Sequence, residues 1–317
     1  MPIFDRYIAV DWSANNGPKT GKDSIWIGEA TSAGLIASRN PATRSGALAD
    51  IKQTLLSARS RGERVMLGFD FVFGFPAGAA AAIAQAASPL DASATFPPAG
   101  EDGRGGAAGW MQLWFTLHTL IADTDANLSN RFDVAEHINR AAAPRFWGHP
   151  HGRSYTHLHP TRARTDYTTI AERRAVEARI RGPQPVWKLT GVGSVGSQTL
   201  LGIPRLEALR RHPVLGRDIA VWPFETDFAD SLIAPITLVE IYPSFFPLDV
   251  AAEPKDRAQV ETYVLRYAAL DAAGLLRTFL SAPADITPAD RAAAIAEEGW
   301  IAGVGQEHLR LAMPVAA

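Results

Sequence analysis

Three acidic residues each stand at the end of an apolar run that is typical of a buried strand. The runs are YIAVD at 7–11, VMLGFD at 65–70 and ITLVE at 236–240. Tyr, Ile, Val and Phe favour strands, whereas an unpaired carboxylate inside a strand is unfavourable by several kcal/mol. Because the carboxyl ends of parallel strands meet at one edge of an open α/β sheet, Asp11, Asp70 and Glu240 are predicted to meet there. The alternative is that each acid caps a turn or the following helix.

Clustered carboxylates at such an edge favour a divalent metal ion. Their like charges repel unless a cation or a proton intervenes, and oxygen-only ligands suit Mg²⁺ or Mn²⁺. Two ions would assist the attack of water on a phosphodiester, with Asp11 bridging them and Asp70 and Glu240 completing the sites. A further catalytic acid is expected near the C-terminus, where Glu297 and Glu298 are adjacent. The alternative is that these two glutamates are ordinary helix-surface residues.

A glycine-rich segment, GVGSVG at 191–196, spells G-x-G-x-x-G and precedes a predicted helix. A dinucleotide-binding fold would need a buried strand before it and an acid about twenty residues after it. Pro183 and Pro185 disfavour that strand, because proline cannot donate to a strand ladder. NADH and NADPH are therefore not expected to bind. The segment is interpreted either as a backbone cradle for an anion or as a plain tight turn.

Several residues are candidates for contact with a substrate. Ser13 follows the first acid, although it could equally bond its own turn or orient Asp11. Nine arginines and only three acids lie between positions 140 and 181, a balance that suits either phosphates or a solvated helix face. The candidate substrate-binding residues are Ser13, Lys188, Gly191, Gly193, Ser194, Arg162 and Arg164.

Four histidines stand as two H-x-H pairs in the same region. They are His149, His151, His157 and His159. In an extended chain residues i and i+2 point the same way, so each pair could chelate zinc. The alternative is that these loop histidines are unbound or face phosphates, since arginines surround them.

Composition limits the class of protein. The 317 residues are 47% apolar and 20% charged, which suits the core of one large domain or two and excludes a disordered or coiled-coil chain. Cysteine is absent, which excludes disulfides, a thiolate nucleophile and a cysteine zinc site. No signal-peptide pattern and no apolar run of about 18 residues is found, so a cytoplasmic protein without a membrane segment is expected. The net charge of −2 does not by itself indicate a nucleic-acid partner.

Hydrophobic periodicity predicts an α/β fold. Strands are expected near 5–12, 24–30, 34–39, 64–71, 219–224 and 236–242. The first three are expected to form an antiparallel meander, and a helical crossover at 45–61 makes the fourth parallel to the first. Further helices are expected at 77–87, 110–121, 131–142, 168–180 and 197–211, and across 254–302. The chain is divided into a core of 1–76 and 215–317 and a helical insertion or cap of 77–214.

The order of strands and strand-end acids in this chain resembles that of the ribonuclease H-like superfold. More narrowly, the chain is similar to the DUF429 family, whose members are predicted nucleases of that fold. The matching segments are AVDWSA at 9–14, GFDFVFGFP at 68–76, RARTD at 162–166, VEIYP at 239–243 and AEEGW at 296–300. The chain departs from the pattern in its C-terminal acid, which is Glu rather than Asp, and in its low basic content. The resemblance implies Mg²⁺- or Mn²⁺-dependent phosphodiester chemistry on nucleic acid or on a phosphate-containing small molecule.

Two other functions are consistent with the same residues. An actin-like ATP-dependent phosphotransferase shares this core, with the first-strand acid positioning the Mg²⁺–nucleotide. That class would need a glycine-rich phosphate hairpin soon after Asp11 and two related halves. A non-catalytic module that binds nucleic acid or nucleotide would use the fold as a scaffold. Some similar chains are assigned to molybdopterin-guanine-dinucleotide synthesis, so a link to molybdopterin cofactor synthesis is kept as an alternative.

Overall fold

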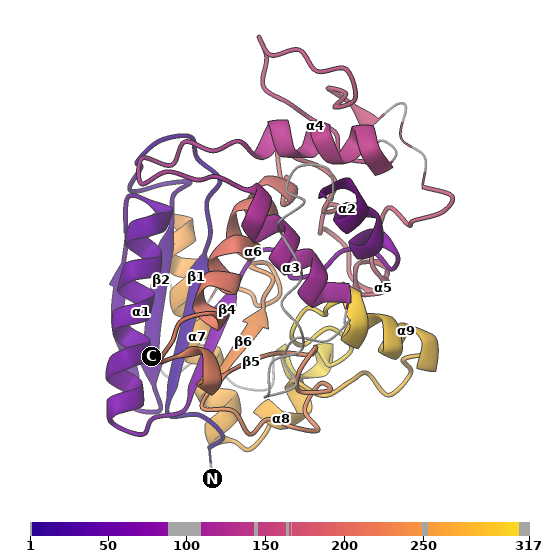
Figure 1. Cartoon of the computed structure of the whole chain (residues 1–317). Coiled ribbons are helices and arrows are strands. Elements are labelled where there is room, and N and C mark those ends of the chain that lie inside the picture. The colour runs from indigo at the N-terminus through magenta and orange to yellow at the C-terminus, as the bar shows by residue number, and fades with distance from the viewer. Residues whose placement is uncertain are drawn as a thin grey trace.

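A six-stranded mixed sheet forms the centre of the computed structural model, which describes residues 2–87, 109–142, 145–162, 165, 167–248 and 253–310 (Figure 1). The strands are β1 (Arg6–Asp11), β2 (Trp26–Thr31), β3 (Gly34–Arg39), β4 (Val65–Phe69), β5 (Ile219–Val221) and β6 (Ile236–Glu240). Their order in the sheet is β3-β2-β1-β4-β6-β5. β2 is antiparallel to both β1 and β3, whereas β1, β4, β6 and β5 are parallel to one another. The predicted combination of an antiparallel meander with parallel strands is confirmed.

Both faces of the sheet are covered, because successive side chains of a strand point to opposite sides. On one face, Val10 packs in an apolar cluster with α1 (Arg44–Ser60). On the other face, Ala9 packs in a second cluster with α7 (Lys255–Ala272). Burial of one large apolar side chain contributes about 1.5–3 kcal/mol to the stability of the fold. Strands that are apolar on both faces therefore need a covering helix layer on each side of the sheet.

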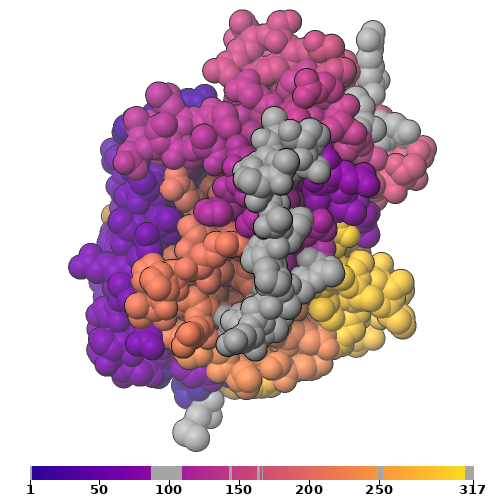
Figure 2. All heavy atoms as spheres, in the orientation of Figure 1, coloured from indigo at the N-terminus to yellow at the C-terminus, as the bar shows by residue number. Residues whose placement is uncertain are grey.

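Five helices lie between β4 and β5 in the described residues. They are α2 (Ala79–Ala87), α3 (Gly109–Leu120), α4 (Arg131–Ala142), α5 (Ala175–Arg179) and α6 (Gly196–Arg210). Apolar side chains of α2, α3, α4 and α6 join the cluster on the α1 face, so these helices share the core of the sheet. Figure 1 shows α4 at the top of the view and α6 close to the sheet. On the face seen in Figure 2, the segment around α6 and β5 lies between the N-terminal helix and the C-terminal segment.

α6 approaches the sheet closely at Gly202, beside the residues that follow Asp70. A Cβ atom at Gly202 would lie 2.3 Å from the Phe71 ring, so a larger residue would force the helix away. This contact fixes the position of α6 relative to the end of β4.

The helix predicted at 168–180 is wrong over its first half. Only α5 is helical there, and Arg174, the residue before it, is extended with φ −71° and ψ 161°. Arg174 is buried, and its guanidinium binds Glu177 and Glu240. Tertiary ion pairs rather than helix propensity therefore set the backbone at this point. The other helices predicted between β4 and β5 are confirmed within two residues at each end.

Between residues 254 and 302 the chain is largely helical with a break near Pro283 and Pro288, as predicted. α7 is followed by α8 (Leu276–Phe279), α9 (Pro288–Ala293) and a π-helical turn, Ala294–Glu298. Short 3₁₀ turns cover Gly216–Asp218 and Glu307–Arg310. Among the described residues, no helix is both long and apolar enough to cross a membrane.

Candidate active site

A cavity of about 700 Å³ opens at the carboxyl edge of β1, β4 and β6. Asp11 ends β1, Asp70 follows β4 and Glu240 ends β6, and all three residues line the cavity. The strand register explains their meeting, because Val10 pairs with Phe69 and Phe69 pairs with Glu240. Acids that are far apart in the sequence thus come to one edge of the sheet.

Asp11 and Asp70 form a carboxyl pair in this cavity. The Trp12 N–H donates to Asp70 Oδ1 at 2.7 Å, and the two carboxyl groups are within hydrogen-bonding reach of each other. Burial raises the pKa of Asp70 to about 7, against the opposing effect of the Trp12 N–H. Burial and the neighbouring Asp70 charge raise the pKa of Asp11 well above its usual range. The pair therefore retains a proton near neutral pH, and a cation would compete with that proton.

The raised pKa of Asp70 makes the stability of the metal-free protein depend on pH. Asp70 binds its proton more tightly in the folded state than in the unfolded chain, so protonation of Asp70 stabilises the fold. This stabilisation is fully present below pH ~4 and is lost as the pH rises to about 7. Asp70→Asn has no carboxyl group at this position, so its stability lacks this dependence on pH. In EDTA, the difference in unfolding free energy between Asp70→Asn and wild type should grow in favour of the variant by roughly 2 kcal/mol from pH 5 to pH 8.

Urea denaturation at several pH values measures that difference. Asp125→Asn, at an exposed position, is the matched control, and its difference from wild type should not change with pH. A difference for Asp70→Asn that is equally constant would mean that the pair is not a shared proton site.

Glu240 also lines the cavity, where its carboxylate is engaged by Arg174 and by a backbone N–H, and its role as a metal ligand stays a prediction. Arg174 Nη2 donates to Oε1 at 2.6 Å and Nη1 donates to Oε2 at 2.8 Å. The Phe73 N–H donates to Oε2 at 2.9 Å. Arg174 Nε also donates to Glu177 Oε1 at 3.0 Å. Loss of one partner from such a buried group leaves an unpaired charge, so Glu240 serves to hold Arg174 and the segment after Asp70.

Glu297 and Glu298 are not among the residues that line the cavity, so the structure does not bring them together with Asp11 and Asp70 there. Glu297 accepts hydrogen bonds from the N–H groups of Gly78 and Ala80 at the start of α2. Glu298 accepts from the Ala77 N–H and from the first N–H of α5. Carboxylates at helix N-termini satisfy unpaired N–H groups and interact favourably with the helix dipole. Both glutamates therefore act as helix caps.

Two acids that the sequence reasoning missed also line the cavity, Asp23 and Asp256. Asp256 lies in the first turn of α7, and its Oδ2 accepts from the Asp23 N–H at 2.6 Å. Burial is the largest cause of the raised pKa of Asp11 and of Asp70, and the charge of Asp256 is among the further causes that raise both. The available signal was its place at the start of the helix that directly follows the third acidic strand.

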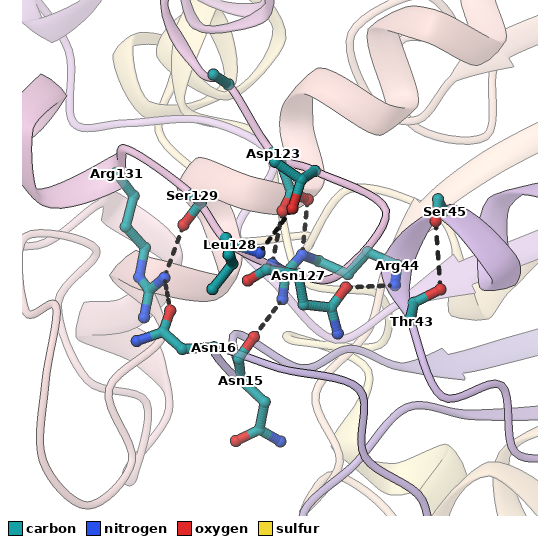
Figure 3. A network of polar contacts seen from close by, with 12 residues as sticks. Asn15, Asn16, Thr43, Arg44, Ser45, Asp123, Asn127, Leu128, Ser129 and Arg131 are labelled. Atoms are coloured by element: carbon teal, nitrogen blue, oxygen red, sulfur yellow. Dashed lines mark hydrogen bonds and ion pairs between the residues drawn. The ribbon is translucent and has the colours of Figure 1, made fainter.

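Arg131, at the start of α4, is a buried arginine in the cavity wall that the sequence reasoning also missed. Figure 3 shows its contacts with Asn16 and Ser129. Its Nε donates to Ser197 Oγ at 3.0 Å, and its Nη1 donates to Asn16 Oδ1 at 2.7 Å and to Ser129 Oγ at 2.8 Å. Within the described part of the chain, no carboxylate lies within ion-pair distance of Arg131.

The neighbouring polar network in Figure 3 holds the loop after β1. Arg44 is fully buried and donates to both carboxylate oxygens of Asp123 at 2.7 Å. Its Nη1 also donates to the carbonyl oxygens of Ser13 and Asn15 at 3.1 and 2.9 Å. Arg44 is the first residue of α1, and it therefore joins the start of this helix to the loop after β1, which contains several of the cavity residues.

The glycine segment contributes Gly191, Gly193 and Ser194 to the cavity wall. The two glycines have φ of 92° and 70°, a left-handed conformation that favours glycine. Lys188 Nζ donates to the Val192 carbonyl oxygen at 2.7 Å, so this lysine holds the segment and is not among the cavity residues. Residues 183–190 contain only an isolated bridge at Lys188 rather than a strand. The expectation that NADH and NADPH do not bind stays a prediction.

The remaining predicted substrate residues differ in their placement. Ser13 lines the cavity, but its Oγ accepts from Asn15 Nδ2 at 2.7 Å, so it bonds its own turn. Arg162 donates to both carboxylate oxygens of Glu172 at 2.5 and 2.7 Å and is not among the cavity residues. Arg164 lies outside the described residues.

Carboxylates are the cavity side chains that could hold a divalent metal ion. In the part of the chain that the structure describes, no group of three or more His, Cys, Asp or Glu side chains is gathered to hold a metal ion. The four histidines between 149 and 159 are among the residues described, and they form no such group. Asp11 and Asp70 offer two carboxylates. Mg²⁺ keeps several waters and is commonly bound by one or two carboxylates and a substrate phosphate, so the pair fits this ion.

The chain matches no protein-family model, no curated protein and no solved structure.

Proposed function

We propose that this protein is a divalent-metal-dependent phosphodiester hydrolase, a nuclease or phosphodiesterase that acts at the Asp11–Asp70 pair. The observation that carries the proposal is this pair, which has raised pKa values and lines a cavity of about 700 Å³. The same cavity contains Arg131, a buried cation without a carboxylate partner in the described chain. The acids favour a cation and the arginine favours an anion, and a metal-bound phosphate ester satisfies both.

We further propose a ribonuclease H-like core in a DUF429-like chain, with residues 77–214 inserted between 1–76 and 215–317. The order β3-β2-β1-β4-β6 supports this assignment, because an antiparallel meander is joined to parallel strands. The acid at the end of β1 and the acid directly after β4 give further support.

Asp11 and Asp70 are the proposed ligands of Mg²⁺ or Mn²⁺. A bound cation would polarise the phosphodiester and lower the pKa of an attacking water. The Trp12 N–H holds Asp70 in place, and loss of the shared proton frees both carboxylates for the cation. Asp256 replaces Glu240, Glu297 and Glu298 as the third acid, because it lines the cavity and its charge acts on both members of the pair.

The cavity favours a small phosphate ester or the end of a single-stranded nucleic acid. Its volume of about 700 Å³ lies in the range of small-molecule sites. A protein that binds duplex along its backbone needs many cations on one surface, whereas this chain has a net charge of −2. We therefore propose a phosphate-containing small molecule or a single-strand end as the substrate.

Wild-type protein should hydrolyse a simple phosphodiester, such as a dinucleotide or bis(p-nitrophenyl) phosphate, with Mn²⁺ or Mg²⁺ and not in EDTA. Calorimetric titration should show Mn²⁺ binding that is tighter at pH 8 than at pH 6, because the carboxyl pair must lose its proton. Absence of divalent-ion binding with substrate present would disprove the proposal. Phosphate transfer from ATP without phosphodiester cleavage would favour the actin-like alternative, and tight nucleic-acid binding without hydrolysis would favour the binding module.

A further inference from the structure

Arg131 differs in its partners from two other deeply buried arginines of the described chain, Arg44 and Arg174. Its side chain is 5% exposed, and burial lowers its pKa to about 10, which still leaves it charged at neutral pH. Arg44 and Arg174 are buried still more deeply, and each is paired with at least one carboxylate. A buried charge without a countercharge is costly, so the burial of Arg131 with no carboxylate partner among the described residues points to an anion that is supplied from outside.

The guanidinium of Arg131 is held in one orientation by neutral oxygens. Nε and Nη1 donate to Ser197, Asn16 and Ser129, which come from three separate segments. Nη2 has no hydrogen bond to any described residue, and it is not sealed inside the protein. Because Arg131 lines the cavity, the two Nη2 donors are available there.

We propose that Arg131 is the centre of a phosphate-binding subsite in this cavity, which holds a phosphate group through the Nη2 side of its guanidinium. The identification of that group as part of the substrate rests on the proposed function, whereas the binding of phosphate does not.

A phosphate fits this subsite better than a carboxylate does. Phosphate accepts several hydrogen bonds at once, and arginine binds it with a fixed, planar set of donors. The acids of the same cavity repel any anion until a cation neutralises them, so phosphate and a divalent ion should strengthen each other's binding. Acetate, with a smaller charge and fewer acceptors, should bind more weakly.

The test is a titration of the full chain with inorganic phosphate in EDTA, at constant ionic strength, followed by calorimetry and by melting temperature. Wild type should show saturable binding, with acetate weaker than phosphate. Arg131→Gln should weaken phosphate binding by about tenfold or more, the typical effect of losing a charged hydrogen bond. Arg131→Lys keeps the charge without the planar donors and should fall between the two. Arg59→Gln, an exposed arginine paired with Asp218 at 2.6 Å, is the control and should bind as wild type does.

Asp11→Asn separates this subsite from the metal site. It should lose metal-dependent hydrolysis and yet bind phosphate as well as wild type or better, because it removes a nearby negative charge. Phosphate binding that is absent in wild type, or unchanged in both Arg131 variants, would overturn the subsite. If neither Arg131 variant folds, the wild-type titration still decides, since no saturable binding of phosphate over acetate would overturn it. Phosphate binding without metal-dependent hydrolysis would instead reject the proposed function and leave the subsite standing.

Discussion

Asp11→Asn should abolish metal-dependent phosphodiester hydrolysis while the metal-free protein stays folded. Asn has the shape of Asp but removes one charge and one ligand oxygen from the pair with Asp70. Loss of even an outer partner of a metal ligand typically lowers affinity or activity by about 10–100-fold, so loss of a ligand should lower activity by about 100-fold or more. The same change removes an ionisable group whose charged form is disfavoured by burial and by repulsion from Asp70. The metal-free variant should therefore melt at the wild-type temperature or above it.

The measurement joins Mn²⁺ calorimetry, melting temperature with and without Mn²⁺, and hydrolysis of a dinucleotide. Wild type should gain stability from Mn²⁺ by mass action, and Asp11→Asn should lose most of that gain. Glu253→Gln, at an exposed position outside the cavity, is the charge-matched control and should behave as wild type does. An Asp11→Asn protein that cleaves as fast as wild type would end the assignment of this pair as the metal site.

Glu240→Gln should destabilise the fold by about 3–5 kcal/mol, because it leaves the Arg174 guanidinium buried with one of its two carboxylate partners removed. A metal ligand behaves in the opposite way, since neutralising one of several clustered acids relieves repulsion. The free energy of unfolding in EDTA therefore separates the two roles of Glu240. Guanidinium denaturation of wild type and Glu240→Gln is the direct measurement.

A second variant keeps this experiment informative if Glu240→Gln is too unstable to study. Glu240→Gln combined with Arg174→Met removes both charges, and replacing a buried ion pair by apolar groups is often nearly neutral. The double variant should therefore be more stable than Glu240→Gln alone, which a double-mutant cycle quantifies. Its Mn²⁺ affinity should stay close to that of wild type. A large loss of Mn²⁺ affinity in a stable double variant would return Glu240 to the metal site.

The contacts of these acidic residues divide them into two groups. Glu240, Glu297 and Glu298 bind an arginine or backbone N–H groups and so hold the segments after β4 and the starts of α2 and α5. Asp11, Asp70 and Asp256 line the cavity, and the charge of Asp256 is among the causes that raise the pKa of Asp11 and Asp70. Loss of the first group should appear mainly as loss of stability, and loss of the second mainly as loss of metal binding.

Local patterns in the sequence predicted most of the elements because their cause is local. Alternating or continuous apolar residues indicate which segments are strands, and the short connections between the first strands require an antiparallel meander. The helix at 168–180 was predicted from its helical residues alone, but Arg174 lies in a buried ion network that the local pattern does not contain. The local pattern identifies Arg131 only as the first residue of a predicted helix, because its hydrogen bond to Asn16, 115 residues away in the sequence, forms only in the folded chain.

The sequence by itself determined the strands and placed Asp11, Asp70 and Glu240 at the ends of strands, because strand periodicity depends on neighbours one and two residues away. The tertiary structure alone decided which of these acids is free to act. Glu240 meets Arg174 across 66 residues, and Glu297 meets Ala80 across 217, whereas Asp11 and Asp70 remain without a cationic partner among the described residues. A carboxylate's chemistry depends on its burial and on the charges within a few ångströms, and those distances exist only once the chain has folded.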